Sequence, residues 1–137
     1  MRNRFDRQLD LLNEKLTAMG AMCEESIALV AKALSNGDLT LAEKVRSESE
    51  TIDSMEREIE NRCMKLLLHQ QPVAKDLRQI SAALKMITDM ERIGVQTRDI
   101  AEIIIFLKGQ SVSGVAIIED MARATIKMVT QSVDAFV

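Results

Sequence analysis

The chain has 137 residues, of which 47% are hydrophobic and 28% charged, so it can form about one domain with a hydrophobic core. Its net charge of −3 disfavours a nucleic acid partner, because binding a phosphate backbone requires a basic face. No apolar run approaches the roughly 20 residues of a membrane span, so we expect a cytoplasmic protein without a transmembrane segment.

Helix-forming residues dominate, and strand-forming residues do not alternate with polar ones, so the pattern predicts an all-α fold. The first helix is expected over 3–36, where apolar residues recur every three or four positions. Gly37 then ends this helix, and Asp38 is a capping residue for the second helix, which repeats the pattern up to residue 70. Pro72 lacks an amide hydrogen, so we expect a third helix to begin there.

The third helix is predicted to run to residue 108, so each helix would be roughly 50 Å long at 1.5 Å per residue. Because only a few residues join these helices, they must fold back on one another as an antiparallel long-helix bundle.

A fourth helical stretch follows, over 115–137, and it is weakly similar to the first. When the two are aligned, Ile118 falls on Leu12 and Met128 falls on Met22. A fixed offset of this kind indicates a tandem repeat, with residues 1–110 as one three-helix unit and 111–137 as the incomplete start of another. The alternative is that any two amphipathic helices align this well.

Carboxylates gather in the second helix, where Asp53, Glu56 and Glu60 lie within about 60° of one another at 100° per residue. Oxygen ligands of this kind suit a hard cation such as magnesium, calcium, manganese or iron. The alternative is a solvated face with i, i+4 ion pairs, such as Glu58 with Arg62.

The apolar stripe of the third helix leads onto a charged residue. It consists of Leu77, Ile80, Leu84 and Ile87, and Glu91 continues it at the same angle. Burying this carboxylate unpaired would cost several kcal/mol, so we expect a basic partner, a metal or a proton for it. Arg98 lies at nearly the same angle and would take a carboxylate from another helix or chain. A solvated salt bridge at the bundle edge remains the alternative.

The remaining chemically distinctive residues do not indicate catalysis. Cys23 and Cys63 lie among apolar residues and do not form a CxxC pair, so we expect small buried hydrophobic side chains. His69 is the only histidine, so the two Glu-x-x-His motifs of a ferritin-like di-iron site are lacking. It lies at a predicted helix end without an obvious nucleophile beside it.

Two segments carry a resemblance that spans nearly the whole chain. The run LLLHQQPVAKDLRQISAALKMITDMERIG at 66–94, with IDSMEREIENRC before it, resembles the PhoU family of phosphate-signalling regulators. The resemblance implies paired three-helix bundles and a cytoplasmic adaptor that is not an enzyme. It also implies association with the phosphate-specific ABC transporter, through its ATPase, and with the phosphate-sensing histidine kinase, in order to restrain the phosphate-starvation response.

The family also has an acidic motif, Glu or Asp followed four residues later by Asp, on two helices of each bundle. In some members these motifs bind iron or zinc clusters. The positions that match here are Ser49 with Asp53 and Glu91 with Val95. Each pair has lost one carboxylate, so the implied iron or zinc site keeps Asp53 and Glu91 as two of its four strong ligands.

Three hypotheses about function follow. In the first, the chain is an adaptor that docks through Asp76, Arg78 and Arg92, although Asp76 would also suit the dipole of a helix start. In the second, it binds metal through Asp53 and Glu91, with Glu50 or Glu56 as a further carboxylate ligand. In the third, it is a helical scaffold without a regulatory role. We also expect a homo-oligomer, such as a dimer, because the fourth helix would otherwise expose its apolar stripe.

Overall fold

The structure is a computed structural model that describes residues 2–69 and 72–137. Four helices make up this part of the chain: α1 (Arg2–Asn36), α2 (Leu39–His69), α3 (Ala74–Phe106) and α4 (Val115–Phe136). Strands do not occur in the two described ranges, so the predicted all-α fold is confirmed. None of the described helices is long and apolar enough to cross a membrane.

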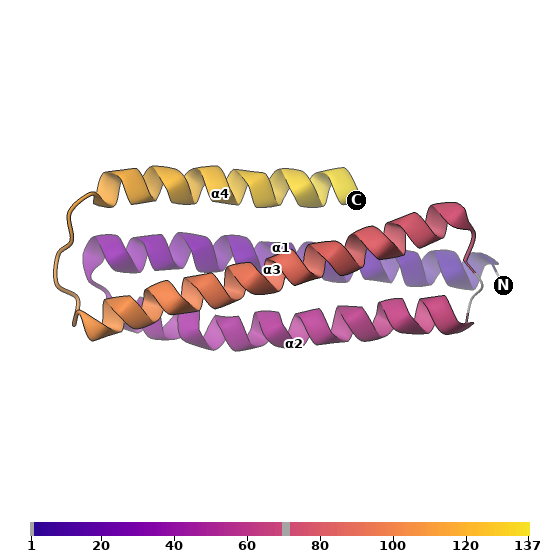
Figure 1. The fold of residues 1–137 in the computed structure, drawn as a ribbon, viewed down its shortest axis with the longest axis horizontal. Helices are drawn as coiled ribbons and strands as arrows, with labels where there is room; N and C mark the ends of the chain where they lie inside the picture. The colour runs from indigo at the N-terminus through magenta and orange to yellow at the C-terminus, as the bar shows by residue number, and fades with distance from the viewer. Residues whose placement is uncertain (1, 70–71) are drawn as a thin grey trace.

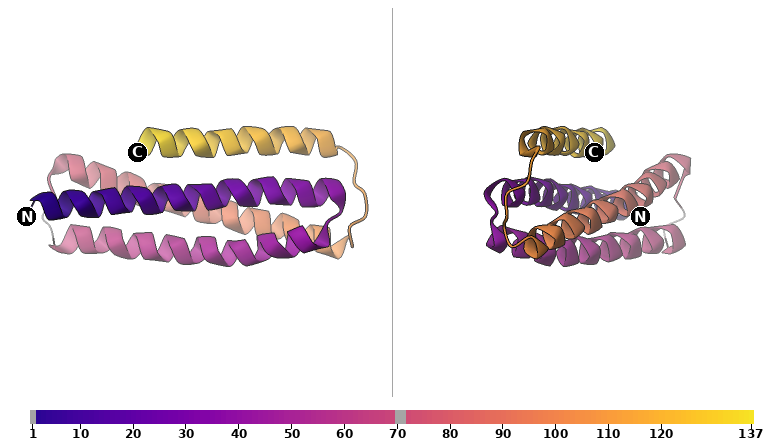
Figure 2. Two further views of the ribbon diagram at one scale, coloured as in Figure 1. Left: turned by 180° about the vertical axis from the view of Figure 1, so that it is seen from behind. Right: turned by 60° about the vertical axis from the view of Figure 1, so that its left-hand side comes forward.

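Helices α1, α2 and α3 run back and forth along one axis and pack against one another, which confirms the antiparallel bundle (Figure 1). Helix α4 lies beside α1, on the side away from α2, as Figure 2 shows from two further directions. It packs mainly on α1 and touches α3 little. The molecule is therefore a three-helix bundle with one added helix, while the division into repeats at residue 110 stays a prediction.

The predicted apolar stripes of α1 and α2 form the core. Leu12, Leu16 and Met19 of α1 and Ile52 and Ile59 of α2 are at most 1% exposed. The two stripes can pack against each other because each keeps a spacing of three and four residues, which places its side chains on one face of the helix.

The turn between α1 and α2 has the predicted chemistry. Gly37 adopts a left-handed conformation with φ of 62°, and the Asp38 amide donates to the Ala33 carbonyl at 3.0 Å, which closes α1. A side-chain oxygen of Asp38 accepts a hydrogen bond from the Leu41 amide at 3.1 Å and so caps α2. The helix stop and the cap are therefore both confirmed.

The predicted start of α3 is wrong by two residues. Pro72 lies outside the helix, Val73 is the N-cap residue in extended conformation, and the helix begins at Ala74. Proline restricts the residue before it and fixes its own φ, but neither effect requires the helix to begin at the proline itself. Helix α2 is described up to His69, and Gln70, where the second helix was predicted to end, lies outside the described residues.

The predicted apolar stripe of α3 is also partly wrong. Leu77 is 42% exposed and Leu84 is only partly buried. The buried seam instead contains large and small residues, namely Ile80, Ala83, Ile87, Met90, Gly94, Thr97, Ala101 and Ile104. Because Met90 and Gly94 occupy the seam, Glu91 lies beside it and not within it.

Two glycines allow close approach between helices. A Cβ atom added at Gly94 of α3 would lie 3.1 to 3.3 Å from carbon atoms of Ile52 on α2. A Cβ atom at Gly20 of α1 would lie 2.7 Å from a methyl group of Val133 on α4. The contact between Ile52 and Gly94 fixes which residues of α2 and α3 face each other, and therefore where the acidic residues meet.

Candidate functional site

The acidic residues singled out in the sequence lie along one edge of the α2–α3 pair. Asp53 follows Ile52, and Glu91 lies one turn before Gly94, so the contact between Ile52 and Gly94 brings their helical turns together. Glu91 is partly buried, and the Asp53 side chain is 46% exposed. The fold thus places both predicted metal ligands at the same edge.

Glu56 connects these carboxylates electrostatically. Partial burial raises the pKa of the Glu56 carboxyl, and the negative charges of Glu60, Glu91 and Asp53 raise it further, while Arg57 opposes them. Carboxylates that share a site disfavour each other's ionisation in this way. The predicted acidic cluster therefore exists in space, and it includes Glu91 from the neighbouring helix.

The donor set at this edge is poor for a metal ion. Asp53 is paired with Arg57 at 2.7 Å, Ser49 is 7% exposed, and Val95 offers no donor atom. Across residues 2–69 and 72–137, no three or more His, Cys, Asp or Glu side chains are arranged so that they could hold an ion. The residues present therefore do not fit a metal centre within one chain.

The three residues predicted to dock a partner differ in accessibility. Arg78 and Arg92 are exposed on α3. Asp76 in the first turn of the helix is only 2% exposed, and it interacts with other groups of the chain. Its position agrees with the alternative role at a helix start, where the dipole favours an anion. A direct contact with a partner is therefore open to the two arginines but not to the Asp76 carboxylate.

Arg98 finds carboxylates on its own helix, contrary to the expectation of another helix or chain. It lies 3.6 Å from Asp99 and 4.0 Å from Glu102. Arg46 of α2 lies 3.9 Å from the same Glu102 carboxylate and 3.2 Å from Glu43. These exposed charges form a solvated network at the α2–α3 edge, which contributes little to stability.

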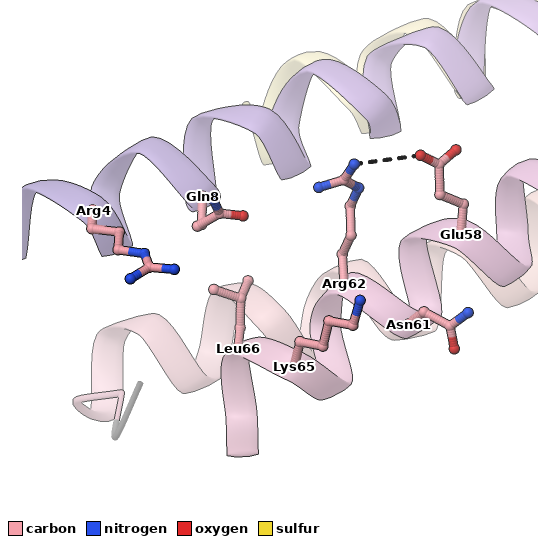
Figure 3. Close-up of a pocket in the computed structure, with 7 residues that line it drawn as sticks. All are labelled: Arg4, Gln8, Glu58, Asn61, Arg62, Lys65 and Leu66. Atoms are coloured by element: carbon pink, nitrogen blue, oxygen red, sulfur yellow. Dashed lines mark hydrogen bonds and ion pairs between the residues drawn. The ribbon is translucent and has the colours of Figure 1, made fainter. Parts of the chain in front are cut away.

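Two further surface features were not predicted from the sequence. One is a pocket of about 480 Å³ between the start of α1 and the end of α2 (Figure 3), lined by Arg4, Gln8, Glu58, Asn61, Arg62, Lys65 and Leu66. The other is an apolar groove of about 300 Å³ formed by α1, α3 and α4, whose lining includes Val30, Ile93, Ile100, Ile118 and Met121. Both features combine residues far apart in the sequence, so only the fold brings them together.

Comparison with known proteins gives a consistent result. Residues 16–104 match the PhoU domain family. A phosphate-specific transport system accessory protein PhoU homolog from Clostridium acetobutylicum is 37% identical over 135 residues, which are 97% of this chain and 62% of the relative. The homolog from Pseudomonas aeruginosa is 34% identical over 96% of this chain and 55% of the relative.

A solved structure supports the same grouping. The crystal structure of PhoU from Pseudomonas aeruginosa matches with a TM-score of 0.90 and 34% identity, over 96% of this chain and 64% of that chain. The chain thus spans roughly three fifths of the length of these relatives. The descriptions of these proteins state an accessory role in phosphate transport and do not name a catalytic activity.

Proposed function

This chain belongs to the PhoU family, and we propose that it is a cytoplasmic adaptor that negatively regulates phosphate uptake and the phosphate-starvation response. It would do so by contacting two partners, the ATPase of the phosphate-specific ABC transporter and the phosphate-sensing histidine kinase. These contacts would place it at the periphery of the membrane. The observation that carries the proposal is the agreement of sequence and fold with PhoU proteins, at 34% identity and a TM-score of 0.90. An adaptor works through its surfaces, so it does not require a catalytic site.

The exposed face of α3 is the surface that best suits such contacts. It carries Arg78 and Arg92, together with the apolar side chains of Ile103 and Phe106, which are 57% and 83% exposed. Arginine and aromatic residues are enriched in protein interfaces, and the most buried part of an interface is apolar. Because α3 has 33 residues, a partner can contact several turns of this face at once.

A binding experiment with purified proteins tests this proposal. The transporter ATPase and the cytoplasmic part of the sensor kinase would each be titrated with the chain, and with a variant carrying Arg78→Glu and Arg92→Glu. We expect binding of at least one partner and at least tenfold weaker binding by the variant, since a reversed charge at an interface costs more than about 1.4 kcal/mol.

Lys32→Glu with Lys127→Glu is the matched control, because it makes the same change of charge at exposed cations of α1 and α4, away from the exposed face of α3. It should leave binding within about twofold. If neither partner binds the unaltered chain, the adaptor proposal is wrong and the helical scaffold becomes the better description. If the Lys32→Glu, Lys127→Glu variant weakens binding as strongly as the arginine variant, the effect comes from net charge and not from the two arginines.

Metal binding is a second candidate function, favoured by one observation. The carboxylates of Glu56, Glu60, Asp53 and Glu91 lie close enough to raise the pKa of Glu56, and a cation would relieve this repulsion. Iron or zinc held through Asp53 and Glu91 would need ligands from water or a second chain, because the chain alone lacks a group of three within its described ranges.

Elemental analysis of protein purified without chelator separates the two candidate functions. If metal binds, iron or zinc should be present in stoichiometric amount and should be lost in both Asp53→Ala and Glu91→Ala. Glu102→Ala, which removes an exposed carboxylate of α3, is the control and should retain the metal. Metal-free protein with unchanged helicity would mean that the site no longer binds metal, because Ser49 and Val95 stand where the family motif has carboxylate ligands.

A further inference from the structure

The pocket between the start of α1 and the end of α2, called the α1–α2 pocket below, lies apart from the acidic edge. Figure 3 shows Arg4 and Gln8 of α1 on one side and Arg62 and Lys65 of α2 on the other. Its volume of about 480 Å³ lies within the usual range for small-molecule sites, roughly 300 to 1,000 Å³. It is large enough for more than a bare inorganic ion.

Positive charge dominates this pocket, although the whole chain carries a net charge of −3. Glu58 is the only acidic residue among the described residues that line it, and it is shared between Lys15 at 2.9 Å and Arg62 at 3.5 Å. The hydrogen bond from Lys15 lowers the pKa of Glu58, so this carboxylate stays ionised. Its negative charge is already paired with Lys15 and Arg62. Arg4 and Lys65 do not form an ion pair with any side chain in the described ranges.

Arg62 provides an independent sign that the pocket is incomplete without a ligand. Its Nε atom is buried, yet it does not donate a hydrogen bond to any group in the described part of the chain. A buried donor without an acceptor is unfavourable and uncommon in folded proteins. An oxyanion in the pocket would supply acceptor oxygens to this guanidinium, which is well suited to contacting two oxygens at once.

We propose that the α1–α2 pocket binds the phosphate group of a small phosphorylated molecule. Arg62 and Lys65 lie one turn apart on the same face of α2, so their side chains can approach one phosphate together. Arg4 closes the site from α1, and Gln8 and Asn61 provide neutral hydrogen-bonding groups for the remainder of the molecule. This inference does not rest on the proposed adaptor function, because every residue in it lies outside the α3 face.

A phosphate group could also come from a lipid headgroup, and the chemistry of recognition would be the same. The two sources differ in what they require of the rest of the pocket. A small molecule must enter between the helices, whereas a headgroup would bring a membrane surface to this end of the bundle. The test therefore includes both sources as separate probes.

The Nε–H signal of Arg62 in a nitrogen–proton correlation spectrum reports directly on the pocket. This signal is assigned to Arg62 because it is missing from the spectrum of the Arg62→Lys variant. The probes are inorganic phosphate, glycerol 3-phosphate, vesicles of phosphatidylglycerol, and sodium chloride at matched ionic strength. We expect a saturable shift with glycerol 3-phosphate, a weaker one with inorganic phosphate, and none with chloride. A response to vesicles alone would assign the phosphate group to a lipid.

The double variant Arg4→Gln, Lys65→Gln should weaken binding at least tenfold, and it should fold normally because both side chains are exposed. The control is Lys85→Gln, Lys127→Gln, which removes the same charge from exposed positions on α3 and α4. The control should bind as the unaltered chain does. Absence of a saturable shift with every phosphate probe, or equal weakening in both double variants, would overturn the proposal.

Discussion

The two cysteines have the buried role that the sequence predicts, and the structure explains why they should be inert. Both are 0% exposed, and the Cys23 thiol lies 3.5 Å from the Met90 carbonyl oxygen. Burial raises the pKa of Cys23 to about 12 and that of Cys63 to about 11, and the charges of Glu24 and Glu60 add to these shifts. The reactive thiolate is therefore almost absent at neutral pH.

We accordingly predict that a thiol reagent at pH 8 leaves both cysteines unmodified in the folded protein and modifies both after denaturation. An added cysteine at an exposed site, Ser54→Cys, gives the reference rate for an accessible thiol. The measurement is the rate of colour release from a disulfide reagent. Reaction of Cys23 or Cys63 at the rate of the added cysteine would show that the core opens freely.

The ionisation of the Glu56 carboxyl destabilises the folded state. Its pKa is raised, chiefly by burial, so the protonated form is favoured in the folded state. The stability that this preference provides is complete below the ordinary value of 4.5 and is lost as the pH rises through the folded pKa. At neutral pH the ionised side chain also repels Glu60, one turn away.

Glu56→Gln should therefore raise the free energy of unfolding at pH 7 by about 0.2 to 0.5 kcal/mol, the usual size of a like-charge i, i+4 repulsion. The gain should vanish at pH 3, well below the ordinary value of 4.5, where Glu56 is protonated in both folded and unfolded states. Urea denaturation at the two pH values measures this difference. A loss of stability at pH 7 would mean that Glu56 has a favourable partner, such as a bound cation.

At the scale of the helices, the two connections at the same end of the bundle depend on paired glycines. Gly37 in the α1–α2 turn and Gly109 after α3 both have positive φ, 62° and 76°. A Cβ atom at Gly109 would lie 2.6 Å from the Gly37 carbonyl oxygen, and a Cβ atom at Gly37 would collide with the Gly109 carbonyl oxygen. The two turns can touch only because both residues lack a side chain.

Gly37→Ala should destabilise the chain by about 2 to 3 kcal/mol, because it combines left-handed strain with this collision. Gly114→Ala is the matched control, since Gly114 also has a positive φ of 77° but its Cβ would meet nothing within 4 Å. It should cost only about 1 to 2 kcal/mol of strain. Equal losses in urea denaturation would show that the contact between the turns does not matter.

At the scale of the whole molecule, α4 is the helix whose apolar side chains are least covered by the rest of the chain. It buries Val129 and Val133 against the rest of the chain, while Ile117, Met121 and Met128 are 67%, 62% and 59% exposed. A contiguous apolar face of this kind marks an interaction surface. We therefore retain the prediction of a homo-oligomer, with a second copy covering this face of α4.

In analytical ultracentrifugation the chain should sediment as a dimer or larger species, and Ile117→Lys with Met121→Lys should convert it to a monomer. Two lysines in a buried apolar interface would remain unpaired, so we expect association at least a hundredfold weaker. Ala116→Lys, at an exposed position outside this face, should leave the assembly unchanged. A monomeric unaltered chain at high concentration would contradict the prediction.

The sequence by itself determined the helices and most of the core, because capping and periodicity are local. The Gly37 stop, the Asp38 cap and the apolar stripes of α1 and α2 each depend on neighbours within one or two turns. The family resemblance likewise rests on short contiguous runs. These signals were sufficient for the fold class and the antiparallel order.

Only the tertiary structure decided which face of α3 is buried and which distant residues meet. Hydrophobicity favoured Leu77 and Leu84, but close packing between helices selected small residues such as Gly94 and Thr97, which no apolar pattern marks. The burial of Asp76 and the grouping of basic residues in the α1–α2 pocket have the same cause. Contacts between helices depend on how closely their backbones approach, and that distance is set by the whole bundle.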